Sequence, residues 1–499
     1  MSTPTRRRFL EQSMFAAAAA AAASGASVSA EQGRGRGGAA GRGSANDTIN
    51  VAVLGTGARG AAHLQAFGGN QEMNTLVTHV CDADDANGQR SAQAVAKRQN
   101  GLVPKVVRDM RHVFDDKSVH AVSIATPNHW HSLASIWAMQ AGKDVYVEKP
   151  ISHNVSEGRR VVEAATKLDR ICQTGTGGRS SVSTADAIAF IRGGGIGEVV
   201  VSRGLCYNRR KEIGPRGAYE VPKTVDYDLW CGPAPMLPLT RQRFHYDWHW
   251  QFPFGNGDIG NQGPHQMDIA RWALGVNRVS DAVIAYGGRV GYEDAGETPN
   301  TIVAIFPYGR QSLVFEVRGL ETAPYRGATV GNVVEGTEGY VLIGRGATTS
   351  AFDKNGKLIR TFSSGGGTDH FANFIQAVRT RSRSVLKADC VEGHLSAALC
   401  HLGNISYLVG QQVSPEAAME RLRALKVSDN VQETFERTRA HLMENKVDVA
   451  KTRLTMGSWL TIDPVTERFT GGTHYEQANA LLTREYRAPY VVPASAAQI

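Results

Sequence analysis

A glycine-rich loop that directly follows a short apolar run constrains this chain more than any other feature. Residues 51–54 (VAVL) lead into Gly55-Thr56-Gly57-Ala58-Arg59-Gly60, the pattern G-x-G-x-x-G where a strand passes into a helix. In such a loop the first glycine makes the tight turn, and the second lets backbone N–H groups approach a pyrophosphate. The third lets helix and strand pack closely. We therefore predict a Rossmann unit in which Gly55, Gly57 and Gly60 hold a dinucleotide.

A later acidic residue supports the same prediction. Support beyond the glycine motif is needed because glycine supplies 54 of the 499 residues, so chance matches to the motif are expected. The strand-like residues 75–81 end at Asp82, about 20 residues after Gly60, where an acidic side chain would bind the ribose hydroxyl of NAD. Asp84 and Asp85 lie next to it, and Asp82 has a second interpretation as the cap of the following helix. A doubly wound sheet that binds no nucleotide is the alternative for the whole region.

The order of strand-like and helical runs divides the chain into domains. Residues 49–174 alternate in the way of parallel βαβ units, which predicts a Rossmann NAD-binding domain. Residues 175–410 are expected to form a second α/β domain with a largely antiparallel open sheet, one face of which meets solvent or a partner. Its strand-like runs are residues 199–207, 279–287, 301–306, 312–318, 329–335 and 339–343. Residues 411–499 are expected to be a C-terminal extension.

The first 48 residues are expected to lie outside both domains. Arg6 and Arg7, an alanine-rich stretch at residues 14–23 and the small residues 28–30 together predict a twin-arginine signal peptide over residues 1–30. A Gly/Arg-rich linker at residues 31–48 follows. The pattern predicts a periplasmic protein carried folded by the twin-arginine export machinery, with the signal either cleaved or kept as a membrane anchor. A basic tail before an alanine helix is the alternative.

Charge and cysteine content bear on two questions, whether the protein binds nucleic acid and whether it contains disulfide bonds. The net charge is +8, and no basic stripe with interleaved aromatic residues occurs, so we expect no nucleic-acid partner. The six cysteines include no C-x-x-C pair. An even number permits disulfides in an exported protein, but no pairing is predicted.

Lys149 is the first candidate for chemistry. It follows the strand-like residues 145–147, and the carboxyl ends of parallel strands face the ligand crevice of an open sheet. A lysine there can hold a substrate hydroxyl and accept its proton while the carbon loses a hydride. Burial beside a nicotinamide cation would lower the pKa of the lysine toward a useful range. An ordinary surface lysine is the alternative.

His265 is the second candidate. Asn261 and His265 are four residues apart, so on one helix face both could address the same ligand, and Asp268 could orient the imidazole or stabilise the helix. His265 would then act as a general base or donate a hydrogen bond to a sugar hydroxyl. A core or surface histidine is the alternative.

The stretch from residue 230 to residue 272 is the richest in aromatic residues and histidine. Aromatic side chains flanked by glycine and proline in a long connection are typical of a binding surface, here one that stacks on sugar rings. A buried aromatic cluster is the alternative. His245 and His249 have the spacing of metal ligands, but no third ligand follows at a useful spacing, so no metal site is predicted.

These motifs together resemble the glucose-fructose oxidoreductase/inositol dehydrogenase/rhizopine-catabolism (Gfo/Idh/MocA) family. The resemblance covers roughly residues 49–410, and the leader and the aromatic segment resemble the exported bacterial branch. The motifs that carry it are Gly55-x-Gly57-x-x-Gly60, Thr126-Pro127-Asn128-x-x-His131, Ala141-Gly142-Lys143, Glu148-Lys149-Pro150 and Gly263-x-His265-x-x-Asp268-x-x-x-Trp272.

The resemblance implies a fold, an activity and site roles. Members have a Rossmann domain and a C-terminal α/β domain whose open sheet often forms homo-oligomer contacts. They mostly act on sugar or cyclitol hydroxyls with NAD or NADP. Lys149 would handle the proton and His265 would be the second catalytic residue. The cofactor, expected to be tightly bound, would contact Gly55, Gly57, Arg59, Gly60, Asp82, Thr126, Pro127, Asn128, Glu148 and Lys149, with His131 supporting the loop.

One departure from the family leaves three functions open. Where the family usually has an aspartate this chain has Asn261, and Asp258 is out of register with that position. The first hypothesis is a sugar or cyclitol oxidoreductase, and the second is an NAD-dependent glycoside hydrolase or lyase that works by transient oxidation and elimination. The third is a non-catalytic carbohydrate-binding protein. NADP stays possible because Arg59 and Arg90 could reach a 2′-phosphate.

Overall fold

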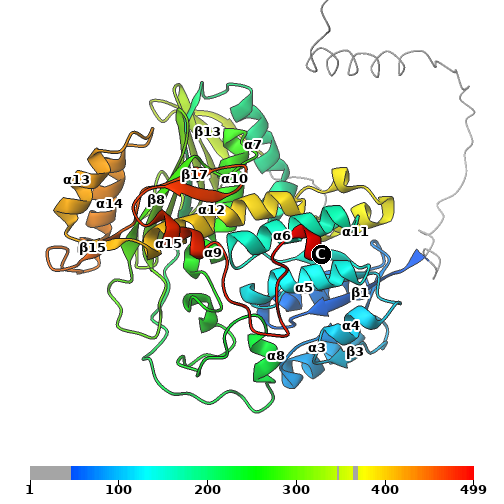
Figure 1. Cartoon of the computed structure of the whole chain (residues 1–499). Coiled ribbons are helices and arrows are strands. Elements are labelled where there is room, and N and C mark those ends of the chain that lie inside the picture. The colour runs from blue at the N-terminus through cyan, green and yellow to red at the C-terminus, as the bar shows by residue number, and fades with distance from the viewer. Residues whose placement is uncertain (1–46, 345–347, 364–368) are drawn as a thin grey trace, which may run out of the picture. The chain divides into compact units, whose positions relative to one another are not determined.

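The computed structural model describes residues 47–344, 348–363 and 369–499 (Figure 1). The expected signal peptide and all but the last two residues of the expected linker lie outside the described residues. Within the described part, no helix has both the length and the apolar character needed to cross a bilayer.

The first domain is built on a six-stranded sheet in which every neighbouring pair is parallel. The strand order is β3-β2-β1-β4-β5-β6, which is the doubly wound order of a Rossmann fold, and it confirms the predicted N-terminal domain. The strands are β1 (Ile49–Leu54), β2 (Thr75–Cys81), β3 (Lys105–Val107), β4 (Ala121–Ile124), β5 (Asp144–Val147) and β6 (Cys172–Thr174).

Helices cover both faces of this sheet, so its central strands are buried along their whole length. All residues of β4 and β5 are buried. Asp84 and Asn154 accept backbone hydrogen bonds in the first turns of α3 and α6, and so set where these helices begin. The helices are α2 (Ala58–Phe67), α3 (Asp85–Arg98), α4 (Arg111–Asp115), α5 (Asn128–Gln140) and α6 (Val155–Lys167).

The second domain is built on a twelve-stranded sheet in the described residues, which confirms the predicted α/β domain with a largely antiparallel sheet. All pairs are antiparallel except β7 with β10. The strands are β7 (Val199–Cys206), β8 (Ala282–Gly288), β9 (Thr301–Tyr308), β10 (Gln311–Arg318), β11 (Val330–Gly336), β12 (Gly339–Gly344), β13 (Ser350–Asp353), β14 (Leu358–Thr361), β15 (Gln411–Val413), β16 (Leu454–Met456), β17 (Leu460–Asp463) and β18 (Arg468–Gly471).

One face of the second sheet packs on α10 (Gly263–Leu274) and α12 (Cys390–Leu408). The side chains of Met267 and Leu399 meet Phe315 of β10 in the largest buried cluster of the described residues. Helix α12 also packs against α6, so it joins the two domains (Figure 1).

The opposite face is less open than expected. Helices α13 (Pro415–Arg423) and α14 (Val431–Glu444) cover the part formed by β7 to β10 (Figure 1). Phe435 of α14 meets Tyr286 of β8 edge to face with ring centroids 5.4 Å apart. The expectation that this whole face meets solvent or a partner is therefore wrong, because the chain covers part of it with its own C-terminal residues.

The C-terminal residues belong to both domains. Residues 411–499, expected as an extension, add β15 to β18 to the second sheet and then return to the Rossmann domain. There Tyr486 donates to Glu157 at 3.2 Å, and Tyr490 packs on Trp130 with ring centroids 5.4 Å apart. The remaining helices are α7 (Val182–Arg192), α8 (Tyr227–Cys231), α9 (Gly257–Asn261), α11 (His370–Thr380), α15 (Tyr475–Ala480) and the 3-10 turns η2 (Gly177–Ser180), η3 (Asp247–Trp250), η4 (Arg383–Val385) and η5 (Ala496–Gln498).

Candidate functional site

The three glycines of the loop after β1 have different surroundings. Gly55 has a φ of +78°, and a Cβ there would lie 2.6 Å from the backbone N of Thr126. A Cβ on Gly60 would lie 2.1 Å from the carbonyl oxygen of Gly55. A Cβ on Gly57, in contrast, would meet no heavy atom of the described residues within 4 Å. Gly55 and Gly60 are therefore needed for packing, whereas Gly57 leaves open the space that a pyrophosphate would occupy.

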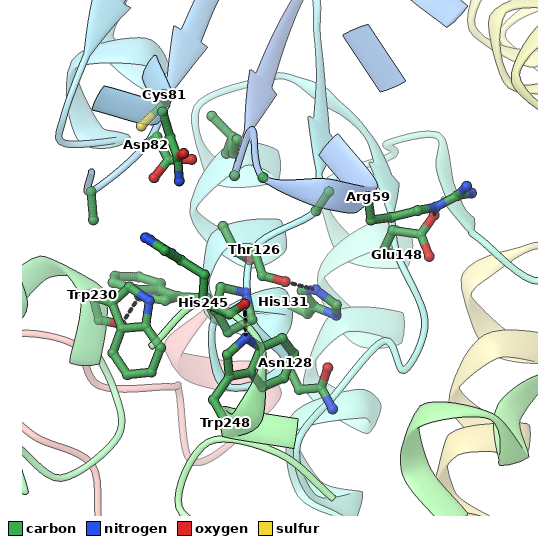
Figure 2. Close-up of a pocket in the computed structure, with 18 of the residues that line it drawn as sticks. Arg59, Cys81, Asp82, Thr126, Asn128, His131, Glu148, Trp230, His245 and Trp248 are labelled. Atoms are coloured by element: carbon green, nitrogen blue, oxygen red, sulfur yellow. Dashed lines mark hydrogen bonds and ion pairs between the residues drawn. The ribbon is translucent and has the colours of Figure 1, made fainter. Parts of the chain in front are cut away.

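A cavity of ≈ 450 Å³ lies at this loop and at the carboxyl ends of β2, β4 and β5 (Figure 2). Asp82 and the Arg59–Glu148 pair lie on different sides of it, and Trp230 and Trp248 of the second domain lie opposite the sheet. The residues expected at the cofactor that line it are Gly55, Gly57, Arg59, Asp82, Thr126, Pro127, Asn128, His131, Glu148 and Lys149.

Asp82 is fixed by backbone and hydroxyl donors. It accepts hydrogen bonds from the backbone N of Thr56 at 2.8 Å and from the Thr56 hydroxyl at 3.0 Å. Burial raises the pKa of Asp82, and the hydrogen bonds from Asp84 and Thr56 oppose this shift. The second interpretation of Asp82 is excluded, because Asp84 caps α3 by accepting from Ala86 at 3.0 Å.

His131 joins the loop after β4 to the loop after β5. Its Nδ1 lies 2.6 Å from the carbonyl oxygen of Pro150, and its Nε2 lies 2.7 Å from that of Thr126. Asn128, in the first turn of α5, donates to Asn256 of the second domain at 3.1 Å. Both loops at the cavity are thus held in place through side chains of α5.

Glu148 is buried and ionised. Its Oε1 lies 2.6 Å from Nε of Arg59 and 3.0 Å from Nε2 of His63. Burial opposes ionisation, but the hydrogen bond from His63 and the charges of Arg59 and Lys149 outweigh it and lower the pKa of Glu148. Arg59 is consequently held beside Glu148, apart from Asp82 in Figure 2. Arg90, the other arginine considered for a 2′-phosphate, bonds to Asn87.

Lys149 and Asn261, predicted separately, meet directly. The Lys149 Nζ donates to the carbonyl oxygen of Asn261 at 2.7 Å and to its Oδ1 at 3.1 Å. Burial lowers the pKa of Lys149, and Arg59 and Arg210 add to the lowering. Glu148 and Asp258 oppose it. The contact from Asn261 carries no charge that would hold the proton on the ammonium.

Asp258 is close enough to influence Lys149 although it is out of register in the sequence. It accepts from Arg210 through both oxygens, at 2.8 Å from Nη2 and 3.0 Å from Nε. This bidentate pair was not found by sequence reasoning, because Arg210 follows β7 and is far from Asp258 along the chain. No spacing signal could have joined them.

The expectation that Asn261 and His265 share one helix face is wrong. Helix α9 ends at Asn261 and α10 begins at Gly263. Asn261 lines the cavity at the glycine loop, whereas His265 lines a second cavity of ≈ 550 Å³ that also includes Lys149. Lys149 therefore lies where both hollows meet, and the catalytic role of His265 stays a prediction.

Asp268 takes part in ion pairs within the second domain. Its carboxylate lies 2.8 Å from Nε of Arg179 and accepts from the Ser396 hydroxyl at 3.0 Å. Arg271 is a further partner at 3.5 Å. Asp268 therefore stabilises the start of the second domain. This favours the expectation that it has a structural role over the expectation that it orients the imidazole of His265.

Residues 224–250, here named the covering segment, close over the carboxyl ends of the first sheet. Thr224 accepts from the backbone N of Asp85 at 3.0 Å, and Asp226 donates its backbone N–H to Ala83 at 2.8 Å. The His245 Nε2 lies 3.0 Å from a carboxylate oxygen of Asp84. The covering segment is thus fixed to the Rossmann domain at the loop that follows Asp82.

The aromatic stretch forms a buried cluster, and some of the same residues also line the cavity, so its role as a sugar-stacking surface stays a prediction. Trp230, Phe244 and Phe254 form a buried cluster, with the Arg241 guanidinium 5.1 Å from the Trp230 ring centroid. The cavity is lined by Trp230, Trp248, His245, Tyr246 and His249. Among the described residues no group of three or more His, Cys, Asp or Glu side chains is placed to hold a metal ion.

Two models of one family match the chain. Residues 49–176 match the Gfo/Idh/MocA oxidoreductase family's NAD-binding Rossmann fold, and residues 209–441 match its C-terminal alpha/beta domain. The structure of levoglucosan dehydrogenase in complex with NADH covers 71% of this chain and 95% of its own, with a TM-score of 0.54 and 18% identity. At this identity the likeness shows the fold alone.

Curated relatives are similar over part of their length. Levoglucosan dehydrogenase of Pseudarthrobacter phenanthrenivorans is 27% identical over 48% of this chain and 54% of that protein. scyllo-Inositol 2-dehydrogenase (NAD(+)) of Bacillus subtilis is 27% identical over 59% of this chain and 74% of that protein. A glycosyl hydrolase family 109 protein of Shewanella sp. is 28% identical over 25% of this chain and 28% of that protein. The chain therefore spans about half the length of the levoglucosan dehydrogenase that it matches.

Proposed function

The chain belongs to the Gfo/Idh/MocA family of oxidoreductases, and on that premise we propose that it oxidises or reduces a hydroxyl group of a sugar or cyclitol with NAD. The observation that carries this proposal is the position of Lys149, which lies in one cavity with the glycine loop and is held there by Asn261. The relatives named levoglucosan and inositol dehydrogenases support the substrate class.

The residues present fit a dinucleotide. Gly57 leaves space beside the N-terminus of α2, where backbone N–H groups favour a phosphate, and Asp82 can accept from ribose hydroxyls. When bound, NAD supplies the hydride acceptor. We propose NAD over NADP because an aspartate lines the cavity and Arg59, one of the two arginines that could reach a 2′-phosphate, is paired with Glu148.

Lys149 is the group that handles the proton. As a neutral amine it accepts the proton of the reacting hydroxyl, and as an ammonium it donates a hydrogen bond to the oxygen of the carbonyl that results. The lowered pKa of Lys149 favours the amine form that accepts the proton. Asn261 orients Nζ through its two oxygens and holds it toward the cavity.

The covering segment supports tight retention of the cofactor. Its bonds to Ala83, Asp84 and Asp85 lie at the carboxyl end of β2, where the ribose would bind. A dinucleotide bound below this segment would leave only when these bonds open.

An NAD-dependent glycoside hydrolase or lyase is the second candidate. The partial match to a glycosyl hydrolase family 109 protein and the neutral Asn261 favour it. In that reaction the glycosidic bond breaks without net redox change, so no NADH accumulates.

One experiment separates the candidates. The nucleotide released by denaturing purified protein is identified by mass spectrometry. The intact protein is then given levoglucosan, scyllo-inositol or 4-nitrophenyl glycosides without added NAD. NADH absorbance with the polyols supports the oxidoreductase, and release of nitrophenol without NADH supports the glycosidase.

Lys149→Met should lower either activity by about 10²- to 10⁴-fold, the usual contribution of a general base, because the methionine side chain cannot accept the proton. Lys97→Met, at an exposed position on α3, is the matched control. If the wild type shows neither reaction and Lys149→Met does not change the binding of polyols, the remaining hypothesis is the non-catalytic carbohydrate-binding protein.

Twin-arginine export and homo-oligomer assembly stay predictions.

A further inference from the structure

His249 has a rigid backbone in the covering segment. It lies in η3, where Trp248 donates its indole N–H to the carbonyl oxygen of His245 at 3.1 Å. Trp250 accepts from the backbone N of Glu297 at 2.8 Å. A Cβ on Gly255 would lie 2.6 Å from the carbonyl oxygen of His249, so that glycine passes directly beside the turn. These contacts hold the backbone that carries the imidazole in place.

The hydrogen bond of one ring nitrogen sets the tautomer of His249. Nδ1 lies 2.5 Å from the carbonyl oxygen of Tyr246, which can accept but cannot donate, so Nδ1 carries the hydrogen. Burial lowers the pKa of His249 to about 3, and the charges of Lys149 and Arg210 add to the lowering. The ring is therefore neutral at pH 7, and its Nε2 bears a lone pair.

The ring is also held against rotation. Its centroid lies 3.7 Å from that of Trp248, and the two planes differ by 20°. Nε2 has no hydrogen-bond partner among the described residues, and the residue lines the cavity that contains Lys149. Lys149 of the first domain and His249 of the second therefore line one cavity, and the Nε2 of His249 is an acceptor without a hydrogen-bond partner among the described residues.

We propose that His249 is a specificity-determining residue whose Nε2 accepts a hydrogen bond from a non-reacting hydroxyl of the polyol held at Lys149. This inference rests on the proposed function and deepens it. A polyol hydroxyl can accept from one group and donate to another, so it matches an acceptor that has no partner in the protein. A substrate without that hydroxyl leaves Nε2 without its bond, and this is the basis of discrimination.

The test compares two substitutions with opposite deficits. His249→Phe keeps a ring that stacks on Trp248 but removes the acceptor, whereas His249→Gln keeps an acceptor and loses the stacking. Levoglucosan, scyllo-inositol and methyl β-D-glucopyranoside are tried in turn, with a dye added as the electron acceptor that reoxidises the NADH formed on the bound cofactor, and reduction of the dye is followed. With the best of them, His249→Phe should raise KM about 10-fold and change kcat little, and His249→Gln should recover most of the loss. His112→Gln, exposed on α4, is the control.

Monodeoxy analogues of the same polyol identify the hydroxyl concerned. One analogue should bind the wild type about 10-fold more weakly and bind His249→Phe no worse than the parent polyol does. A KM unchanged in His249→Phe would overturn the inference and leave the proposed function standing. So would a lower content of bound nucleotide, measured by mass spectrometry, because His249 would then contact the cofactor. If none of the three polyols reduces the bound cofactor, the proposed function and this inference fail together.

Discussion

Asn261 binds Lys149 through two oxygens of one residue, and neither of them carries a full charge. The backbone carbonyl and the side-chain amide orient Nζ, as a carboxylate would, but they stabilise the ammonium form less than a carboxylate does. The charged groups that act on Lys149 are Glu148, Arg59, Asp258 and Arg210, which oppose one another in pairs. Because these charges oppose one another, burial determines the direction of the pKa shift, and the pKa of Lys149 is lowered.

Asn261→Asp should move the pH profile of the enzyme. The base is the neutral amine, so kcat/KM rises as the pH passes upward through the pKa of Lys149. A carboxylate next to Nζ raises that pKa by about 1–3 units, so the rising limb should shift to higher pH by a similar amount. The pH dependence of kcat/KM is measured for the wild type, Asn261→Asp and the neutral control Asn261→Gln. A limb that stays in place in Asn261→Asp would contradict the role of Lys149 as the base.

Single residues at strand ends were the most predictable part of the site. Lys149, Asp82 and Asn128 follow β5, β2 and β4, and parallel strands bring their carboxyl ends to one edge whatever the details of packing. The position of His249 beside the same cavity was not predictable, because it depends on how the covering segment folds over the first domain.

At the scale of elements, two glycines of the loop between β1 and α2 have different roles. Gly60 is needed for packing and Gly57 leaves space for the nucleotide, so a variant of each can be compared. Gly57→Val should fold with little change in stability but bind less nucleotide, because its side chain enters the space left at the loop. Gly60→Ala should lose about 3 kcal/mol, because its Cβ would collide with the carbonyl oxygen of Gly55. Thermal unfolding and the nucleotide content per chain are measured for both. Equal loss of stability in the two variants would contradict the division of roles.

The break between α9 and α10 was the main error of sequence reasoning at this scale. Four-residue spacing places two side chains on one face within a single helix, and Asn261 and His265 belong to different helices. A signal was present, because Pro264 lies in the first turn of α10, and proline is favoured at the first positions of a helix.

At the scale of the whole molecule, the C-terminal residues link the two sheets and shield one of them. Arg203 of β7 is buried between Glu316 of β10 at 2.7 Å and Asp429, before α14, at 2.5 Å. Arg437 of α14 reaches the same Glu316 at 2.9 Å. Such buried charges require their partners, so α14 is bound specifically to this face.

The run of residues 434–445 predicts a helix, but which surface it covers depends on contacts distant in sequence. An oligomer built on the sheet would have to use the part that α13 and α14 leave free.

Phe435→Ala tests whether these helices are part of the core. Phe435 is fully buried against Tyr286, so its removal leaves a cavity between α14 and the sheet and should cost about 3–5 kcal/mol of the free energy of unfolding. Met443→Ala on the same helix removes a side chain that is 52% exposed and should cost less than about 1 kcal/mol. Denaturant unfolding measures both. A loss for Phe435→Ala as small as the control's would contradict this and mean that α14 rests on the sheet without contributing to its core.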